Sequence, residues 1–135
     1  MKILHVITSL STGGAEKLMV DLLPRLRDLG NEVELLIFDG KRTAFYNELE
    51  QIGIKIHHLS IGGNVYNPLN IFKLTKYIKY YDIIHTHNTA CQYFIPIAKI
   101  IAFAKCKLVT TEHSTSNRRR KFNWFRPIDR WIYSR

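Results

Sequence analysis

Residues 2–38 read KILHVITSLSTGGAEKLMVDLLPRLRDLGNEVELLIF, which is an apolar run, a glycine turn, an amphipathic segment and a second apolar run. Both apolar runs, residues 2–8 and 32–38, are short and rich in Ile, Leu and Val, as is typical of strands buried on both faces. Between them, apolar side chains recur from Ala15 to Leu29 at the spacing of a surface helix, and Gly30 supplies a C-terminal cap. This stretch predicts a strand, a crossover helix and a second strand.

The same alternation continues along the chain. Further strands are predicted at residues 54–59, 82–87 and 107–112, and further helices at about 43–52, 68–81, 89–104 and from Pro127 onward. Right-handed crossovers leave few topologies for such a pattern. We predict one Rossmann-like α/β domain over residues 1–135, a doubly wound parallel sheet in the order 3-2-1-4-5 with helices on both faces. In this order a ligand crevice opens beyond the carboxyl ends of the first and fourth strands.

Composition narrows the class of protein. The chain has 135 residues, of which 46% are hydrophobic, and this is the size and composition of one globular domain. Cys91 and Cys106 lack CxxC spacing and lie in apolar stretches, so we expect buried, reduced thiols and a cytoplasmic location. The most apolar stretch, residues 93–104, is shorter than the ~20 residues of a membrane span.

Charge is concentrated at one end. The formal net charge is +9, and residues 118–135 carry +6 of it, from seven Lys and Arg residues against one Asp. Its densest run is Arg118, Arg119, Arg120 and Lys121. A basic end suits nucleic acid or an anionic membrane, but no nucleic-acid motif accompanies it. Lys73, Lys76 and Lys79 lie beside aromatic residues on a predicted helix, so membrane contact and a merely solvated face both remain open.

Two glycines follow the first predicted strand. In the segment Thr12-Gly13-Gly14, backbone N–H groups can approach a ligand with no side chain in the way, and the helix N-terminus behind them favours an anion such as phosphate. The alternative is a tight turn in which Glu16 complements the helix dipole. The spacing matches neither GxGxxG nor a Walker motif. Phosphate binding and a structural turn both remain open on these residues.

Histidines follow two other strands of the predicted sheet. Residues 84–88 read IHTHN and residues 110–114 read TTEHS, which places His87 and His113 at the predicted crevice, with His85 on the same face as His87. An imidazole there can bind a substrate hydroxyl or developing charge, and three histidines can in principle bind a metal. No ligand spacing supports the metal. His5, inside the first strand, and His57 and His58, at the third, are interpreted as structural.

At this point the chain resembles a known family. The segments MKILHVITSL, GGAE, LRDLGNEVELL, DIIHTHN and LVTTEHS, in this order, resemble the N-terminal domain of family 4 glycosyltransferases, which have the two-domain GT-B architecture. The resemblance covers essentially the whole chain. It implies a domain that holds the acceptor, a second domain that binds most of a nucleotide-sugar donor, and transfer with retention of anomeric configuration. It also implies that no metal or other cofactor is required.

Carried onto this sequence, the resemblance implies roles for single residues. Gly13 and Gly14, after Thr12, would face the donor diphosphate, and the catalytic candidate His113 would approach the transferred sugar. His87, Asn88 and Glu112 would line the substrate site. The expected acceptor is a saccharide or a lipid-linked saccharide of cell-surface polysaccharide synthesis.

The resemblance also implies that this chain corresponds to only one of the two domains of such an enzyme. The donor-binding domain of the family has no counterpart in these 135 residues, so we expect a truncated N-terminal domain, half of an active site and inactive by itself. Lipid-linked acceptors suggest peripheral contact with the inner face of the membrane through Arg118, Arg119, Arg120 and Lys121. The alternative is a stand-alone basic module that binds an anionic membrane or another polyanion without catalysis.

Overall fold

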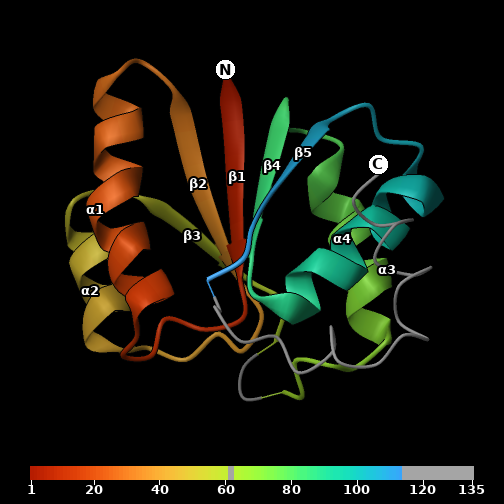
Figure 1. The fold of residues 1–135 in the computed structure, drawn as a ribbon, viewed down its shortest axis with the longest axis horizontal. Helices are drawn as coiled ribbons and strands as arrows, with labels where there is room; N and C mark the ends of the chain where they lie inside the picture. The colour runs from red at the N-terminus through yellow and green to blue at the C-terminus, as the bar shows by residue number, and fades with distance from the viewer. Residues whose placement is uncertain (61–62, 114–135) are drawn as a thin grey trace.

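The computed structural model describes residues 1–60 and 63–113. Its centre is a sheet of five parallel strands in the order β3-β2-β1-β4-β5 (Figure 1). The strands are Lys2–Ile7 (β1), Glu32–Ile37 (β2), Lys55–His58 (β3), Ile83–His87 (β4) and Lys107–Thr111 (β5). The predicted order is confirmed, and each predicted strand end lies within one residue of the observed end.

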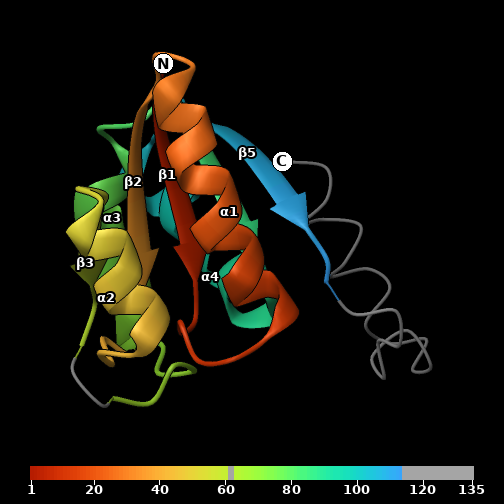
Figure 2. The same cartoon turned by 90° about the vertical axis from the view of Figure 1, so that its left-hand side faces the viewer.

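Helices cover both faces of the sheet, as predicted. Helices α1 (Gly14–Asp28) and α2 (Ala44–Gln51) lie on one face, and α3 (Leu69–Ile78) and α4 (Thr89–Ala102) lie on the other (Figures 1 and 2). Helix α3 ends three residues before the predicted end. There the amide of Asp82 donates to the carbonyl of Lys2 (2.9 Å), which draws the chain into the sheet. The helix predicted from Pro127 lies outside the described residues.

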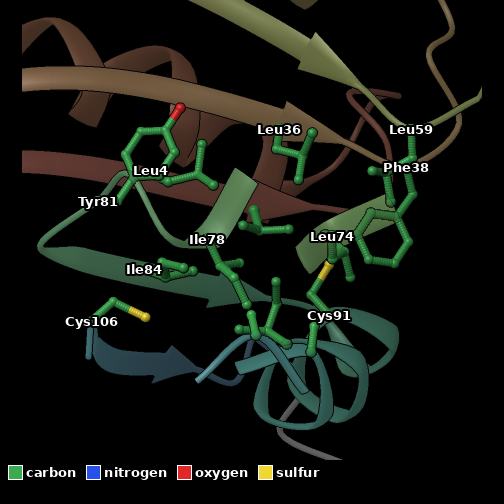
Figure 3. Close-up of a cluster of buried hydrophobic side chains, with 14 of the residues drawn as sticks. Leu4, Leu36, Phe38, Leu59, Leu74, Ile78, Tyr81, Ile84, Cys91 and Cys106 are labelled. Atoms are coloured by element: carbon green, nitrogen blue, oxygen red, sulfur yellow. The ribbon is translucent and has the colours of Figure 1, made fainter. Parts of the chain in front are cut away.

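Each face of the sheet has its own hydrophobic core. Leu4, Leu36 and Ile84 point toward α3 and α4 and pack with Leu74 and Cys91 (Figure 3). Alternate residues of the same strands point the other way, where Ile7, Leu35 and Ile37 pack against Met19 and Leu23 of α1. Cys91 and Cys106 are buried and free, which confirms the prediction of buried thiols, and burial raises the pKa of both.

Strand register places three histidines on the α1 face. His5 of β1 lies opposite His85 of β4, and His87 lies opposite Thr111 of β5. The flanking residues Leu4, Val6 and Ile84 belong to the core under α3 and α4, so the intervening histidines point to the opposite face. All three imidazoles therefore come from the half of the sheet formed by β1, β4 and β5.

The structure covers only some of the residues that suggested contact with a membrane. None of the described helices has both the length and the apolar character needed to cross a membrane. On α3, Phe72 is exposed, as is Tyr80 just beyond the helix, but Lys73 donates from Nζ to the carbonyl of Leu59 (3.2 Å). The basic residues Arg118, Arg119, Arg120 and Lys121 lie outside the described part of the chain.

Candidate functional site at the carboxyl ends of the strands

The carboxyl ends of β1, β4 and β5 meet at one edge of the sheet, and side-chain contacts join them. Asn88, after β4, donates from Nδ2 to Oγ1 of Thr8, after β1 (3.2 Å). His87, the last residue of β4, contacts His113, two residues beyond β5, with a 3.0 Å separation between Nδ1 and Nε2. The structure thus brings His87, Asn88 and His113 together, at the edge where the order of strands predicts a crevice.

The two glycines begin α1 at the same edge. Gly13 is the N-cap with φ −179°, which is extended backbone open to any residue, and Gly14 is the first helical residue. In the described part of the chain, a Cβ on Gly14 would meet nothing within 4 Å, and one on Gly13 would meet only the end of the Glu16 side chain. Neither the backbone nor packing therefore requires glycine here. The structure also places Glu16 in the first turn of α1, so both interpretations, a ligand-binding backbone and a structural turn, stay open.

Three imidazoles form a continuous hydrogen-bonded series, which we call the histidine chain: His5, His87 and His113. Nδ1 of His5 lies 3.1 Å from Nε2 of His87, and Nδ1 of His87 lies 3.0 Å from Nε2 of His113. The ring centroids are 5.4 Å and 5.3 Å apart, which exceeds each N···N distance by about the width of one imidazole ring. The rings therefore lie end to end, as linear N–H···N hydrogen bonds require.

Burial keeps the inner part of the histidine chain uncharged. His5 is 1% exposed and His87 is 0% exposed, whereas His113 is exposed. Burial, with a contribution from His85, lowers the pKa of His5 to about 3. Burial, with contributions from His85, His5 and His113, lowers the pKa of His87 to about 2. Both rings are therefore neutral near pH 7, and each offers one N–H donor and one nitrogen acceptor.

This geometry changes two sequence predictions. His87 was expected to line the substrate site, but its ring is fully buried and both nitrogens face other histidines, so the ring itself is not exposed at this edge. His5 was interpreted as structural, yet it begins the histidine chain. Its position inside an apolar run gave no sign of this, because the contact depends on the register between β1 and β4.

His85 lies beside the histidine chain but has a different partner. Its Nε2 lies 2.7 Å from Oγ1 of Thr111, and its ring centroid is 4.1 Å from that of His87. Burial, followed by the nearby His113, lowers the pKa of His85. A hydroxyl and an imidazole are therefore held together on the half of the sheet that carries the crevice.

His5, His85 and His87 also satisfy a simple distance test for metal binding, because one nitrogen from each lies within 4.8 Å of the others. Their orientation opposes a shared ion. The facing nitrogens of His5 and His87 are 3.1 Å apart along a line, so an ion between them would lie at about half that distance from each. A Zn–N bond needs about 2.0–2.1 Å. Binding would require the rings to turn away from each other.

The backbone at Asn88 is unusual. Asn88 has φ 70° and ψ 159°, a combination that residues with a Cβ rarely adopt. It joins β4 to α4, and its side chain bridges to Thr8. Backbone strain of this kind costs about 1–3 kcal/mol and tends to occur at functional sites. The strain at the carboxyl end of β4 supports a functional role for this edge.

The other candidate residues are less informative. Thr12 is exposed and Glu112 is half-buried.

A pocket of about 510 Å³ lies at the opposite, amino edge of the sheet, lined by Met1, Tyr81, Asp82, Lys105 and Lys107 among others. It is remote from the strand ends where ligands of parallel α/β sheets bind. We therefore assign the candidate site to the carboxyl edge, because the histidine chain and the strained Asn88 lie there.

Comparison with known proteins agrees with the fold. The sequence model of Glycosyltransferase Family 4 matches residues 12–135, which is most of the chain and includes both the glycine turn and His113. The chain belongs to glycosyltransferase family 4. As a family 4 domain, it has the Rossmann-like fold expected for one half of the GT-B architecture.

Individual relatives of this family 4 domain are longer than it. The capsular polysaccharide biosynthesis glycosyltransferase CapH of Staphylococcus aureus is 33% identical over 87 residues, which are 64% of this chain and 24% of CapH. A glycosyltransferase from Rickettsia africae superposes with a TM-score of 0.69 at 26% identity, over 94% of this chain and 32% of that one. HepE of Anabaena, in complex with UDP-glucose, gives 0.67 at 25% identity, over 91% and 32%. The chain thus spans a quarter to a third of these relatives.

Proposed function

We propose that this chain is the acceptor-binding N-terminal domain of a retaining hexosyltransferase. It would act on a nucleotide-sugar donor and a saccharide or lipid-linked acceptor, in cell-surface polysaccharide synthesis. The observation that carries the proposal is the meeting of His87, Asn88 and His113 at the carboxyl edge of a family 4 sheet, where the glycine turn also lies. The UDP-glucose held by HepE supports the donor class, and the capsular role in the name of CapH supports the pathway class.

The residues of this edge suit the charge changes of glycosyl transfer. A nucleoside diphosphate leaves, and N–H donors already aimed at its oxygens stabilise the charge that develops. Gly13 and Gly14, at the N-terminus of α1, offer such donors without side chains of their own, and the space beside Gly14 is open. His113, exposed at the end of the histidine chain, reaches toward the transferred sugar, while Asn88 and Glu112 border the acceptor. In this proposal, sugar transfer at the carboxyl edge requires no metal or other cofactor.

We further propose that a donor-binding domain completes the site, since the relatives are about three times as long. The 135 residues alone would then transfer no sugar, and robust transfer by them would contradict this half-site. We place the protein in the cytoplasm, against the inner face of an anionic membrane, a proposal supported by exposed Phe72 and Tyr80 near the lysines of α3. A basic binding module without catalysis is the alternative, and it predicts no affinity for nucleotide sugars.

Replacing Gly14 by Ala separates a ligand role from a structural role. Gly14 is the first residue of α1 and has open space around its missing Cβ, so we expect the free energy of unfolding to stay equal or rise by about 0.5–1 kcal/mol. The added methyl would obstruct a diphosphate on the backbone, so we expect affinity for UDP-glucose to fall at least about tenfold, or ~1.4 kcal/mol. Calorimetric titration and thermal unfolding measure the two effects.

The matched control for this experiment is Asp28→Ala, an exposed substitution at the other end of the same helix. It should leave the affinity for UDP-glucose unchanged. If Gly14→Ala binds as tightly as the unaltered chain, the glycine turn is only a turn, and the proposed donor contact is wrong.

A further inference from the structure

The histidine chain has a property that separate histidines lack, because its rings fix one another's protons. His5 and His87 are neutral, so each carries one N–H. Each N···N contact needs one donor and one acceptor, and His87 takes part in both contacts. If His87 accepts at Nε2 it must donate at Nδ1, and if it donates at Nε2 it must accept at Nδ1. Two arrangements of protons are therefore open to the neutral histidine chain, and they run in opposite directions.

The inner end of the histidine chain decides between them. Nε2 of His5 is buried and has no hydrogen-bond partner among the described residues. In one arrangement this nitrogen carries a buried N–H without an acceptor, and in the other it carries an unpaired lone pair. A buried donor or acceptor without a partner costs about 1–3 kcal/mol, and among buried backbone groups an orphaned N–H is rarer than an under-used acceptor, a preference that we extend to this ring. The second arrangement is favoured, with the proton of His5 on Nδ1.

The proton positions then follow along the histidine chain. His5 donates from Nδ1 to Nε2 of His87, and His87 donates from Nδ1 to Nε2 of His113. When His113 carries a single proton, that proton must therefore be on Nδ1, the nitrogen not used in the histidine chain. We propose that His5 and His87 are positioning residues that hold His113 as an Nδ1–H donor at the crevice. Its ligand atom would be an oxygen of the sugar or diphosphate, and this part rests on the proposed function.

The closed inner end also excludes one other role. A proton relay needs an exit at each end, yet within residues 1–60 and 63–113 Nε2 of His5 is buried from solvent and has no hydrogen-bond partner. A proton taken up at His113 could not leave through His5. The histidine chain is therefore suited to orienting one donor, as the partners of metal-bound or catalytic histidines orient those rings, and not to conducting protons.

Nitrogen NMR of the 135-residue chain with ¹⁵N-labelled histidine tests the proposal without substrate. Two-bond correlations identify the protonated nitrogen of each ring, and couplings across the N–H···N bonds identify each donor. At pH 7 we expect Nδ1–H in His5, His87 and His113 alike. Finding His113 as Nε2–H, or as a mixture in which Nε2–H prevails, would overturn the proposal.

Substitution of His87 tests whether the proton position of His113 depends on the histidine chain. His87→Phe keeps a flat ring but removes both nitrogens, so His113 should lose its Nδ1–H form and take the Nε2–H form that free imidazole side chains prefer in water. His85→Phe is the matched control, since His85 packs beside His87 but bonds to Thr111, and His113 should remain Nδ1–H. An unchanged Nδ1–H signal from His113 in His87→Phe would overturn the positioning role. Because no ligand is present, these results are independent of sugar transfer.

Discussion

Lowering the pH from 7 to 5 is expected to reduce the free energy of unfolding by about 4 kcal/mol through two histidines alone. The folded-state pKa values of His5 and His87 are about 3 and about 2, well below the ordinary value of about 6.5. Below pH 6.5 the unfolded chain takes up protons that the folded chain does not, so stability falls with pH at up to ~1.4 kcal/mol per unit for each ring. The loss continues until the folded-state pKa values are reached.

Denaturant unfolding at pH 7 and pH 5 measures this loss. His5→Phe keeps a ring of similar shape and removes one of the two buried titrating groups, so it should halve the loss to about 2 kcal/mol. His58→Gln, on the edge strand β3 and exposed, should leave the loss unchanged. A stability that does not vary between pH 7 and pH 5 would mean that His5 and His87 are accessible to protons in the folded state.

The second large effect, a loss in the free energy of unfolding, is expected when Glu34 or its partner is substituted. Glu34 is a buried carboxylate on β2. Its side chain is 6% exposed, and Oε2 accepts hydrogen bonds from Oη of Tyr81 and from Nε2 of His57, both at 2.5 Å. Burial alone would raise the pKa of Glu34, but the hydrogen bonds from Tyr81 and His57, with the charge of Lys55, more than offset it, and the net pKa is lowered. Any stability that this shift contributes is present above the unfolded-state pKa and is lost as the pH falls below it.

The losses from removing the two partners of this pair should not add. Tyr81→Phe takes a donor from a buried carboxylate and should lower the free energy of unfolding by about 2 kcal/mol. Glu34→Leu leaves the Tyr81 hydroxyl without its acceptor and should cost about 3 kcal/mol, from the lost charge-assisted bonds and the orphaned donor. The double variant replaces the pair by apolar groups, so its loss should be at least about 1 kcal/mol smaller than the two single losses combined.

Urea unfolding at pH 7 of the four chains of this cycle gives the coupling between Glu34 and Tyr81. Additive losses would show that the two side chains do not interact in solution, contrary to the 2.5 Å contact. Glu34 lies toward the amino end of the sheet, so none of these variants should change affinity for UDP-glucose.

The sequence was sufficient for the fold because each strand and helix carries its own periodic signal. Apolar runs such as residues 32–38, the stripe from Ala15 to Leu29 and the stop at Gly30 each predict a local structure, and right-handed crossovers then limit the order of strands. The meeting of His87 and His113 was predictable for the same reason, since both follow neighbouring parallel strands. Such arguments need only the order of elements and not their atomic contacts.

The contacts that the sequence did not reveal depend on register. His5 reaches His87 because β1 and β4 pair with His5 opposite His85, and a shift by one residue would turn its ring to the other face. Glu34 stands in an apolar run, and its partner Tyr81 is 47 residues away, so no local pattern links them. The end-to-end geometry of the histidine chain likewise appears only when three strands are in place.

The most direct test of the central claim is to map where UDP-glucose binds on the isotope-labelled 135-residue chain by NMR. If the carboxyl edge of β1, β4 and β5 is half of a glycosyltransferase site, the backbone signals of Gly13 and Gly14 and the side-chain signals of Asn88 and His113 should shift in a saturable way. Signals of Glu34, His57 and the pocket at Lys105 and Lys107 should stay fixed. Saturable shifts confined to that amino-edge pocket, with Gly13, Gly14, Asn88 and His113 unmoved, would contradict the assignment of the site.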